Sequence, residues 1–432
     1  MSLPNPCGQA GAVDVVVIGA GHCGLAVSFN LTSLGIAHVV LERGAVANSW
    51  RKERWDSLRL LTPNWMSSLP GQAYEGSDPD GFMTMPEVAD FVAAYAARID
   101  APVRTNTTVT RVHAAGDGYR VETTQGNWQC RALVIASGAF NTASLPKVSQ
   151  AMPVDIAQVT AHQYKNPAQL AEGGVLVVGA SATGLQLADE IARSGRAVTL
   201  AAGEHVRLPR RYRGRDIKWW MQASGLLDEC IFEAEDLARL RRVPSPQLVG
   251  SPDNATLDLN ALRAQGVRIT GRLMGVRDGK AQFSGSLRNV CQLADLKMNR
   301  LLKAIDEFAA DAGIDAAPAE TFEPTQVDAT ATLSLKLDGD AVKTVVWATG
   351  FRPDYSWLDV PVLDRKGNLR HTGGVVDAPG LYAMGLPFMR RRKSSFMHGA
   401  ADDARDITQH LAGFLANHPR DVSVTGEQRV AV

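Results

Sequence analysis

Two glycine-rich segments carry the clearest chemistry in this 432-residue sequence. The first is GAGHCG at residues 19–24, which follows an apolar run and precedes a stretch of helix-forming residues. In a strand–turn–helix unit of this kind, Gly19 permits the tight turn, Gly21 lets the backbone approach a pyrophosphate, and Gly24 lets helix and strand pack closely. The N-terminus of the helix adds unpaired N–H groups and a positive dipole end. This segment predicts a dinucleotide site.

Glu42 sharpens that prediction. It ends the next expected strand, 18 residues past Gly24, where a carboxylate can accept the protons of both ribose hydroxyls. A chance acid beside a glycine turn is the alternative, and the strand–turn–helix context makes it much less favoured. We therefore assign the first site to FAD, whose ribose carries no 2′-phosphate.

The second segment, GASATG at residues 179–184, repeats the pattern with one change. Ser181 replaces the middle glycine, and its small side chain still allows close approach. The expected nucleotide ligands here are Gly179, Ser181, Ala182, Thr183 and Gly184.

The two strand ends that follow these turns differ in charge. Glu42 lies 23 residues after Gly19, whereas the same offset from Gly179 reaches Ala202, which is followed by basic residues. A missing carboxylate with guanidinium groups nearby suits a ribose 2′-phosphate, which predicts NADPH at the second site. A solvated basic loop is the alternative. The expected phosphate ligands are Arg207 and Arg210, then Arg211, with His205 beside them.

Two further features have an expected place near the cofactors. The strands 133–138 (LVIASG) and 345–350 (VVWATG) end alike, in a glycine that lets the chain pass close to a ligand. They mark where the chain leaves one nucleotide domain and re-enters it. Trp50 lies in the NSWR segment at 48–51, and its indole can stack beside a flavin. A surface loop that packs its aromatic side chains inward explains Trp50 equally well.

The elements that must position these residues follow a duplicated β–α–β order, which is the main organisational feature of the sequence. The remaining pattern predicts a capping box at Thr84 and Glu87, a three-stranded meander, and a separate strand after it. The expected ranges are strand 13–18, helix 25–34, strand 37–42, meander 109–112, 119–123 and 128–131, strand 133–136, strand 175–178, helix 185–193, strand 197–201, helix 298–312, strand 344–348, strand 380–384 and helix 400–415.

Composition limits the function classes. Acidic and basic residues balance at 45 each, so no global field recruits nucleic acid or an anionic membrane. The five cysteines form no C-x-x-C pair, which disfavours a disulfide reductase and a zinc ribbon. No histidine pair has metal-ligand spacing beside a carboxylate, so no metal is expected. No stretch approaches the roughly 18 apolar residues of a membrane span, and residues 1–12 lack signal-peptide character. A cytoplasmic location is expected.

The sequence thus predicts an α/β protein with two Rossmann-like dinucleotide-binding domains, for FAD and NADPH, the second inserted in the first. The expected divisions are a leader at 1–12, the FAD-binding domain at 13–140, a crossing linker at 141–173, the NADPH-binding domain at 174–340, the return of the FAD-binding domain at 341–418, and a loose tail at 419–432.

In this order the motifs resemble those of the single-component, NADPH-using flavin-containing monooxygenases, including plant indole-pyruvate monooxygenases and bacterial relatives. The similarity covers nearly the whole chain, from Val13 to about Leu415. The segments that carry it are GAGHCG, NSWR, DSLRLLTP, FMTMPEVADFVAAYA, YKNP, GASATG, HVRLPRR, WATGFRPD and GLYAMGLPFMRRRKSSFMHGA.

The resemblance implies cofactor contacts as well as chemistry. Implied FAD ligands are Gly19, Gly21, Gly24, Glu42, Arg43, Trp50, Arg59, Thr62, Val109, Gly138, Gly350 and Gly385. No catalytic residue is assigned, because the flavin carries the chemistry; residues expected near it are Leu61, Thr62, Asn64 and Thr160. The sequence departs from the family in two places. The family's F-x-G-x-x-x-H histidine falls near Thr160, and the asparagine that many members place beside the flavin falls near Leu61.

The resemblance implies that NADPH reduces FAD and that one oxygen atom of O2 passes, through a C4a-(hydro)peroxyflavin, to a small organic nitrogen, sulfur or carbonyl substrate. Two alternatives stay open: an NADPH oxidase or NADPH:acceptor reductase without productive oxygen transfer, and a flavoprotein redox sensor that does not turn over. A small-molecule substrate and O2 are the expected partners, and a homodimer is the candidate assembly.

Overall fold

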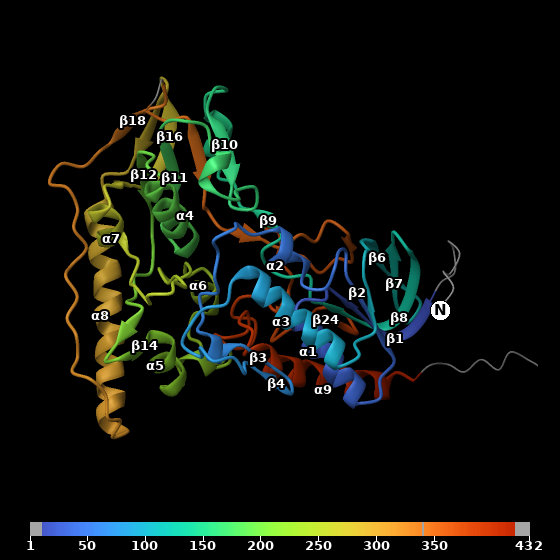
Figure 1. Ribbon diagram of the computed structural model, residues 1–432. Helices are drawn as coiled ribbons and strands as arrows, with labels where there is room; N and C mark the ends of the chain where they lie inside the picture. The colour runs from blue at the N-terminus through green and yellow to red at the C-terminus, as the bar shows by residue number, and fades with distance from the viewer. Residues whose placement is uncertain (1–10, 339–340, 420–432) are drawn as a thin grey trace, which may run out of the picture.

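Two lobes, each built around a parallel sheet, make up the computed structural model, which describes residues 11–338 and 341–419 (Figure 1). The predicted α/β class with two Rossmann-like domains is confirmed. None of the helices in these two ranges is long and apolar enough to cross a membrane. The predicted leader lies outside the described residues up to position 10, and β1 already begins at Gly11. The predicted tail lies outside them from position 420.

The first lobe contains a ten-stranded sheet whose parallel centre is formed by β5, β2, β1 and β8. Buried valines fill the centre of β1, as expected for a strand covered on both faces. The strands of this sheet are β1 (Gly11–Ile18), β2 (His38–Leu41), β5 (Val103–Arg104), β6 (Val109–Ala115), β7 (Gly118–Thr123), β8 (Gly126–Ile135), β21 (Leu358–Asp359), β22 (His371–Thr372), β23 (Val375–Val376) and β24 (Leu381–Ala383).

β8 corrects one boundary. The sequence predicts two strands, at 128–131 and 133–136, whereas the structure has a single strand from Gly126 to Ile135. Its first half pairs antiparallel with β7 and its second half pairs parallel with β24. A long strand that changes partners along its length looks like two strands in the sequence, because its burial pattern changes in the middle.

Helices α1, α3 and α9 belong to the first lobe, and α1 contacts α9 although the two are far apart in sequence (Figure 1). The capping box at the start of α3 is present, with the Thr84 amide donating to Glu87 at 2.7 Å. This lobe also holds α2, the short pair β3–β4 and one 3₁₀ turn. Their bounds are α1 (His22–Ser33), α2 (Asn48–Lys52), α3 (Met85–Arg98), α9 (Ala400–Asn417), β3 (Ser68–Leu69), β4 (Gln72–Ala73) and η1 (Asn64–Met66).

The second lobe has a five-stranded parallel sheet in the order β10-β19-β11-β12-β15. Helices α4 and α7 contact each other beside it, and a three-stranded antiparallel sheet shares a separate core with its strands. The elements are β10 (Ala157–Thr160), β11 (Val175–Val178), α4 (Ala182–Arg193), β12 (Val198–Ala202), α7 (Leu259–Ala264), β15 (Arg268–Gly271), β16 (Leu273–Arg277), β17 (Lys280–Phe283), β18 (Ser334–Lys336) and β19 (Thr344–Trp347).

Two strands of this sheet lie outside the predicted NADPH-binding domain. β10 comes from the predicted linker, and β19 comes from the predicted return of the FAD-binding domain, yet β19 pairs with both β10 and β11. The return to the first lobe therefore follows Gly350, which agrees with the similar strand ends at Gly138 and Gly350. Just beyond those glycines the two crossing segments pair antiparallel, as β9 (Thr142–Ala143) and β20 (Phe351–Arg352).

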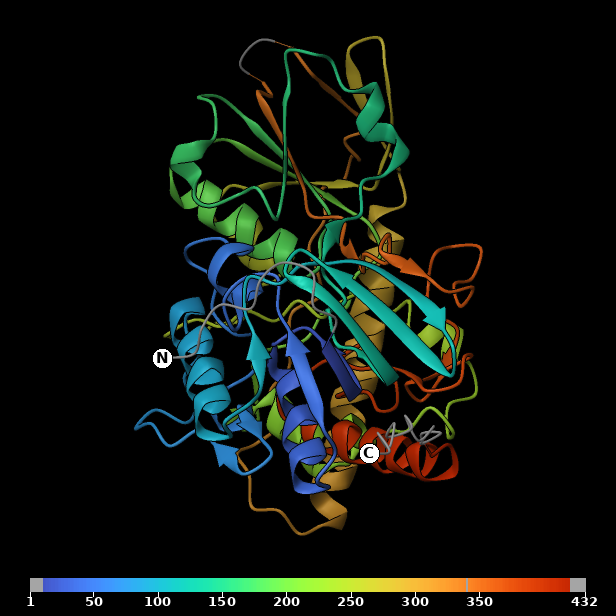
Figure 2. The ribbon, with the colours of Figure 1, turned by 90° about the vertical axis from the view of Figure 1, so that its right-hand side faces the viewer.

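A third hydrophobic core lies beneath the second sheet, around α5 and the long helix α8 (Figures 1 and 2). The sequence predicts helix only from Met298, but α8 begins at Leu287. Met66 of the first lobe packs into the same core, so this region joins the two lobes. The remaining elements are α5 (Ile217–Ala223), α8 (Leu287–Asp311), α6 (Leu237–Leu240), β13 (Arg211–Tyr212), β14 (Arg215–Asp216), η2 (Lys147–Ala151), η3 (Pro167–Gln169) and η4 (Leu226–Asp228).

Candidate cofactor and active site

The first glycine turn has the geometry of a phosphate-binding loop. Gly19 has a φ of +107°, and a Cβ there would lie 2.5 Å from the Ala136 carbonyl oxygen. A Cβ on Gly24 would lie 1.9 Å from the Gly19 oxygen. In contrast, a Cβ on Gly21 would meet nothing within 4 Å. Two of the glycines therefore serve the packing of the turn, and the space over Gly21 at the start of α1 is open to a ligand.

Glu42 organises this turn from the end of β2. Its carboxylate is buried, and it accepts hydrogen bonds from the Ala20 amide at 2.9 Å and the Gly44 amide at 3.0 Å. Each carboxylate oxygen can accept more than one hydrogen bond. The residue therefore retains acceptor capacity for ribose hydroxyls while it holds the turn.

A cavity of about 520 Å³, which we call the nucleotide cavity, opens over this turn. Eight of the twelve residues that the resemblance implies for FAD line it, which leaves Gly24, Arg59, Thr62 and Gly350 outside. A volume of this size lies within the usual range for cofactor pockets. The eight are Gly19, Gly21, Glu42, Arg43, Trp50, Val109, Gly138 and Gly385.

The sequence motifs do not identify all the residues that line this cavity. The cavity wall includes Arg54, whose guanidinium carbon lies 5.5 Å from the Trp50 ring, and Asn141, which links the two crossing segments. The Asn141 amide donates to the Ser137 oxygen at 2.9 Å, and its side-chain oxygen accepts from the Asp354 amide at 3.1 Å. No spacing rule identifies the contact of Asn141 with Asp354, because it depends on the pairing of β9 and β20.

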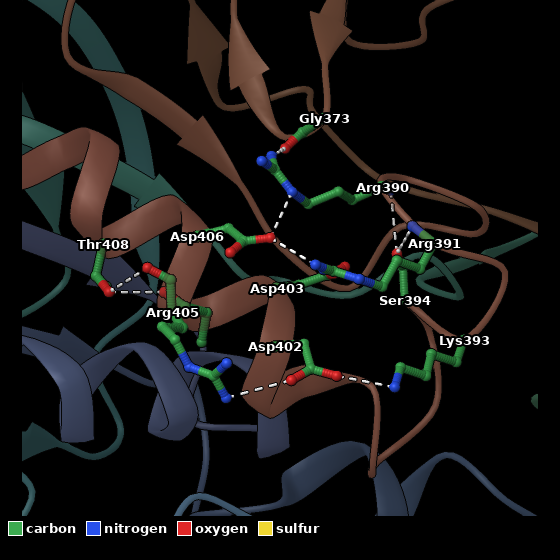
Figure 3. A network of polar contacts seen from close by, with 11 residues as sticks. Gly373, Arg390, Arg391, Lys393, Ser394, Asp402, Asp403, Arg405, Asp406 and Thr408 are labelled. Carbon is green, nitrogen blue, oxygen red and sulfur yellow. Dashed lines mark hydrogen bonds and ion pairs between the residues drawn. The ribbon is translucent and has the colours of Figure 1, made fainter. Parts of the chain in front are cut away.

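The return segment before α9 supplies Gly385 and Ser395 to the same cavity. Between them, consecutive basic side chains are held by acidic residues of α9, as Figure 3 shows. Arg391 binds Asp403 at 2.6 Å and Asp406 at 2.8 Å, and Arg390 binds Asp406 at 2.7 Å.

The last cation of this run, Lys393, bridges Asp402 of α9 at 2.8 Å and Asp228 of the second lobe at 2.5 Å. The neighbouring Arg392 pairs with Glu229 of the second lobe. The basic run thus fixes one wall of the nucleotide cavity and links it to the second lobe.

Two buried histidines stay neutral, and one of them, His22, lines the cavity. Burial lowers the pKa of His22 and of His398 to about 4. Among the described residues, neither His22 Nε2 nor either ring nitrogen of His398 has a hydrogen-bond partner. Buried polar atoms without partners are rare in folded proteins. His22 lines the nucleotide cavity, so its free Nε2 fits a polar ligand there.

The second glycine turn repeats the backbone of the first. Gly179 has a φ of +113°, and a Cβ on Gly184 would lie 1.8 Å from the Gly179 oxygen. Ser181 is the N-cap of α4, and its side chain makes no capping hydrogen bond. Gln247 holds this turn by donating to the Ala180 oxygen at 2.8 Å, and its buried Oε1 has no partner among the described residues. That free acceptor and the free N-terminus of α4 fit a polar ligand at this turn.

The strand end after this turn lacks an acid, as the sequence predicts. Gly19 donates to the Leu41 oxygen and Gly179 to the Ala201 oxygen, so Glu42 and Ala202 hold equivalent positions. Ala202 is buried.

The basic residues predicted to bind the 2′-phosphate are engaged elsewhere. Arg207 is 5% exposed and donates to Asp258 through both Nε and Nη2 and to Asp295 through Nη1. Arg210 is 1% exposed and binds Asp216 at 2.6 Å. The loop folds inward, so both guanidinium groups are engaged by buried carboxylates, and their binding of a 2′-phosphate stays a prediction.

The other two predicted ligands also fail to supply a cation at the strand end. His205 is buried, its Nδ1 lies 3.0 Å from the Gly203 oxygen, and burial lowers its pKa, so it stays neutral. Arg211 lines a different cavity, which contains no residue of the 179–184 turn. Neither residue therefore offers a positive charge to a phosphate beside Ala202.

Arg272 is an exposed arginine near this strand end that the sequence reading did not single out. It follows β15, whose last residue Gly271 pairs with Ala202. A Cβ on Gly203 would lie 3.8 Å from Arg272 Cδ and Cγ, so the arginine stem runs over that glycine. Its exposed side chain forms no ion pair within the described ranges. Because Gly271 lies 69 residues after its partner Ala202, the sequence offers no signal for this neighbour.

The four residues predicted near the flavin ring do not line the nucleotide cavity. Asn64 is buried, its amide donates to the Asp78 oxygen at 2.9 Å, and its oxygen accepts from the Met83 amide at 2.8 Å. Thr160 bonds to Gln163 in the second lobe. Asn64 and Thr160 therefore serve local structure. The Leu61 oxygen accepts from Arg210 at 2.8 Å, and Thr62 lies half-buried beside it.

Comparison with known proteins places this fold in a family. Residues 16–224 match the family model of pyridine nucleotide-disulphide oxidoreductases. An oxidoreductase of Geobacillus kaustophilus, named uncharacterized and CzcO-like, is 31% identical over 409 residues, which cover 94% of this chain and 99% of the relative. The chain belongs to the CzcO-like oxidoreductases. This CzcO-like chain is therefore an oxidoreductase.

Two further matches confirm the resemblance predicted from the motifs. The probable indole-3-pyruvate monooxygenase YUCCA9 of Arabidopsis thaliana is 29% identical over 209 residues, which cover 46% of this chain and 49% of the plant protein. A solved flavin-containing monooxygenase from Stenotrophomonas maltophilia superposes with a TM-score of 0.66 at 20% identity, covering 94% of this chain and 99% of that one. The fold is that of the flavin-containing monooxygenases.

Proposed function

We propose that this chain is an NADPH-dependent FAD monooxygenase that transfers one oxygen atom from O2 to a small organic nitrogen, sulfur or carbonyl substrate. The observation that carries the proposal is the pair of equivalent glycine turns with opposite strand ends, Glu42 at the first and Ala202 at the second. A carboxylate suits a free ribose and opposes a 2′-phosphate, whereas its absence admits one. FAD and NADPH are the cofactors that the family comparisons support.

The residues of the first lobe hold FAD in this proposal. The N–H groups at the start of α1 face the pyrophosphate over Gly21, and Glu42 accepts from the ribose. Trp50 packs against the flavin or its ribityl chain, with Arg54 beside it. When bound, FAD accepts hydride from NADPH and supplies the chemistry with oxygen.

The residues of the second lobe hold and orient NADPH. The start of α4 faces the pyrophosphate, and the Ser181 side chain is small enough to allow its approach. Arg272 supplies the cation for the 2′-phosphate in place of Arg207 and Arg210. The ion pairs of Lys393 and Arg392 with residues 228 and 229 keep the second lobe against the cavity wall, which helps to exclude water from the space between the cofactors.

Coupling measurements test the proposal. Purified protein should be yellow, should consume NADPH faster than NADH, and should release little hydrogen peroxide per NADPH once a substrate is present. Amines, sulfides, ketones and indolic acids form the first screen. A protein that binds no FAD, or that uses NADH and NADPH equally, would contradict the proposal.

An NADPH oxidase is the second candidate, favoured by a specific observation. Asn64, the asparagine expected near the flavin ring, does not line the nucleotide cavity, and both ends of its side-chain amide are engaged by backbone groups. Oxygen transfer would therefore lack the support of this side chain. Stoichiometric hydrogen peroxide release with every substrate in the screen would favour the oxidase, and negligible NADPH consumption would favour a redox sensor.

A further inference from the structure

A second cavity lies between the lobes, outside the nucleotide cavity. We call it the seam cavity. It has a volume of about 550 Å³, within the range of small-molecule sites, which often lie at domain interfaces. Trp65 and Asp80 contribute from the first lobe, and the β13–β14 hairpin and α5 contribute from the second. No residue of either glycine turn lines it.

Two acceptor oxygens in its wall lack donors. The Asp216 side chain is only 9% exposed. Its Oδ1 accepts from Arg210 at 2.6 Å and from the Lys218 backbone amide at 2.7 Å. Its Oδ2 has no hydrogen-bond partner in the described part of the chain. Gln222 is held by donating to Asp228 at 3.0 Å, and its buried Oε1 is likewise without a partner. Unpaired buried acceptors of this kind call for a ligand that donates N–H groups.

Two guanidinium groups in the same wall lack carboxylate partners. Arg211 is exposed, and within the described residues its guanidinium donates only to the Gly214 oxygen. Arg215 forms no ion pair among residues 11–338 and 341–419, and it lies over the Trp219 ring at 4.0 Å from the centroid. Arg211 stands opposite Asp216 in the β13–β14 pairing, and Asp216 is bound by Arg210, so Arg211 and an ion-paired carboxylate both line the cavity.

The remaining wall is aromatic. Trp65 and Trp219 come from opposite lobes and flank the cavity. Indole faces favour planar, apolar groups. The seam cavity therefore offers an unpaired acceptor for an ammonium group, a neighbouring guanidinium for a carboxylate, and two rings for an apolar body.

We propose that the seam cavity binds a small aromatic amino acid. The ammonium group would donate to Asp216 and Gln222, the carboxylate would bind Arg211 and Arg215, and the ring would pack between the two indoles. Arg210 binds both Asp216 and the Leu61 oxygen. A ligand bound to Asp216 would therefore be linked through Arg210 to Leu61, in the segment expected near the flavin. The inference rests on the proposed function only for the role of the ligand, as substrate or as regulator, and not for its binding.

Calorimetric titration of the flavin-containing protein tests the site with three matched probes. L-phenylalanine carries both charges, phenethylamine lacks the carboxylate, and 3-phenylpropionate lacks the ammonium. We expect saturable binding of L-phenylalanine and affinities at least about tenfold weaker for the other two, because each loses a charge-assisted contact. Equal affinity for all three, or no saturable binding of L-phenylalanine, would overturn the proposal.

Variants separate this site from general effects. Arg211→Met and Arg215→Met should each weaken L-phenylalanine binding about tenfold, whereas Arg300→Met, at an exposed arginine of α8 with no contact to the cavity, should leave it unchanged. Unaltered binding in the double variant Arg211→Met with Arg215→Met would sink the assignment.

The role of the ligand follows from NADPH consumption. Stimulation by L-phenylalanine, with an oxygenated product, identifies a substrate. A change in the rate of NADPH consumption without an oxygenated product identifies a regulator, and both results support the site. The titration needs neither NADPH nor turnover, so loss of the proposed monooxygenase function would leave its outcome intact.

Discussion

The two glycine turns have nearly the same backbone and different surroundings. In each turn, the first glycine has a φ above +100°. A Cβ on the third glycine would lie less than 2 Å from the carbonyl oxygen of the first. The first turn is held through an amide, by Glu42 at the end of β2, and the second through a carbonyl, by Gln247 from a distant loop. In the proposed function, the shared backbone binds a pyrophosphate at each turn, and the residue at the strand end selects the nucleotide.

Gly21→Val should have the largest effect, because it blocks the ligand without disturbing the protein. A Cβ at Gly21 meets nothing within 4 Å, so the fold should survive while the pyrophosphate space is filled. We expect complete loss of FAD, measured as the absorbance ratio at about 450 and 280 nm.

Gly24→Ala is the matched control for that variant. Its Cβ would lie 1.9 Å from a backbone oxygen, so it should lower the thermal stability of the apoprotein. Retention of FAD by folded Gly21→Val would show that the first turn does not bind the cofactor.

Arg207→Ala should lower the free energy of unfolding by about 3–5 kcal/mol. The change leaves Asp258 and Asp295 buried without their counter-ion, which is the costly way to break a buried ion pair. Urea unfolding measures the loss, with exposed Arg300→Ala as the control. Any effect on coenzyme binding should be equal for NADPH and NADH. A selective loss of NADPH would restore Arg207 as a phosphate ligand.

The stability of the protein should fall on acidification because of His22, which stands where the second turn has Ala182. Its pKa is about 4 in the folded state against 6.5 for an ordinary histidine, so the unfolded chain takes up the proton first. The contribution of His22 to the free energy of unfolding is then constant above pH 6.5, and it falls by about 1.4 kcal/mol per pH unit between pH 6.5 and about 4.

His22→Ala makes the first turn resemble the second and tests that slope. Urea unfolding of apoprotein at several pH values should show a decline shallower than in the unaltered chain. Histidines such as His371 and His398, whose pKa burial also lowers to about 4, remain in both proteins and contribute to the remaining slope. Identical slopes would mean that His22 does not stay neutral in the folded chain.

Arg272→Ala should have the smallest effect, confined to one coenzyme. Loss of a charge-assisted contact to the 2′-phosphate should raise the dissociation constant for NADPH about tenfold and leave that for NADH unchanged. Reductive half-reaction kinetics with each coenzyme provide the measurement, and Arg268→Ala, at an exposed arginine of β15, the strand that precedes Arg272, is the control. Parallel losses for both coenzymes would assign Arg272 a structural role.

The sequence by itself determined what depends on neighbours along the chain. The turn glycines, the helices that follow them, the acid at position 42 and its absence at 202 belong to contiguous β–α–β units, whose hydrogen bonds and packing are local. The duplication and the similar strand ends at 138 and 350 follow from the same periodicity. These features were sufficient for the fold class and for the family resemblance.

Only the tertiary structure decided which partners the charged side chains have. Arg207 meets carboxylates 51 and 88 residues away, and Arg272 reaches Gly203 only because β15 pairs with β12. A run of arginines looks the same in the sequence whether it is solvated or buried, because the carboxylates that offset the cost of desolvating it lie on other elements. The seam cavity likewise exists only where a loop of one lobe meets a hairpin of the other.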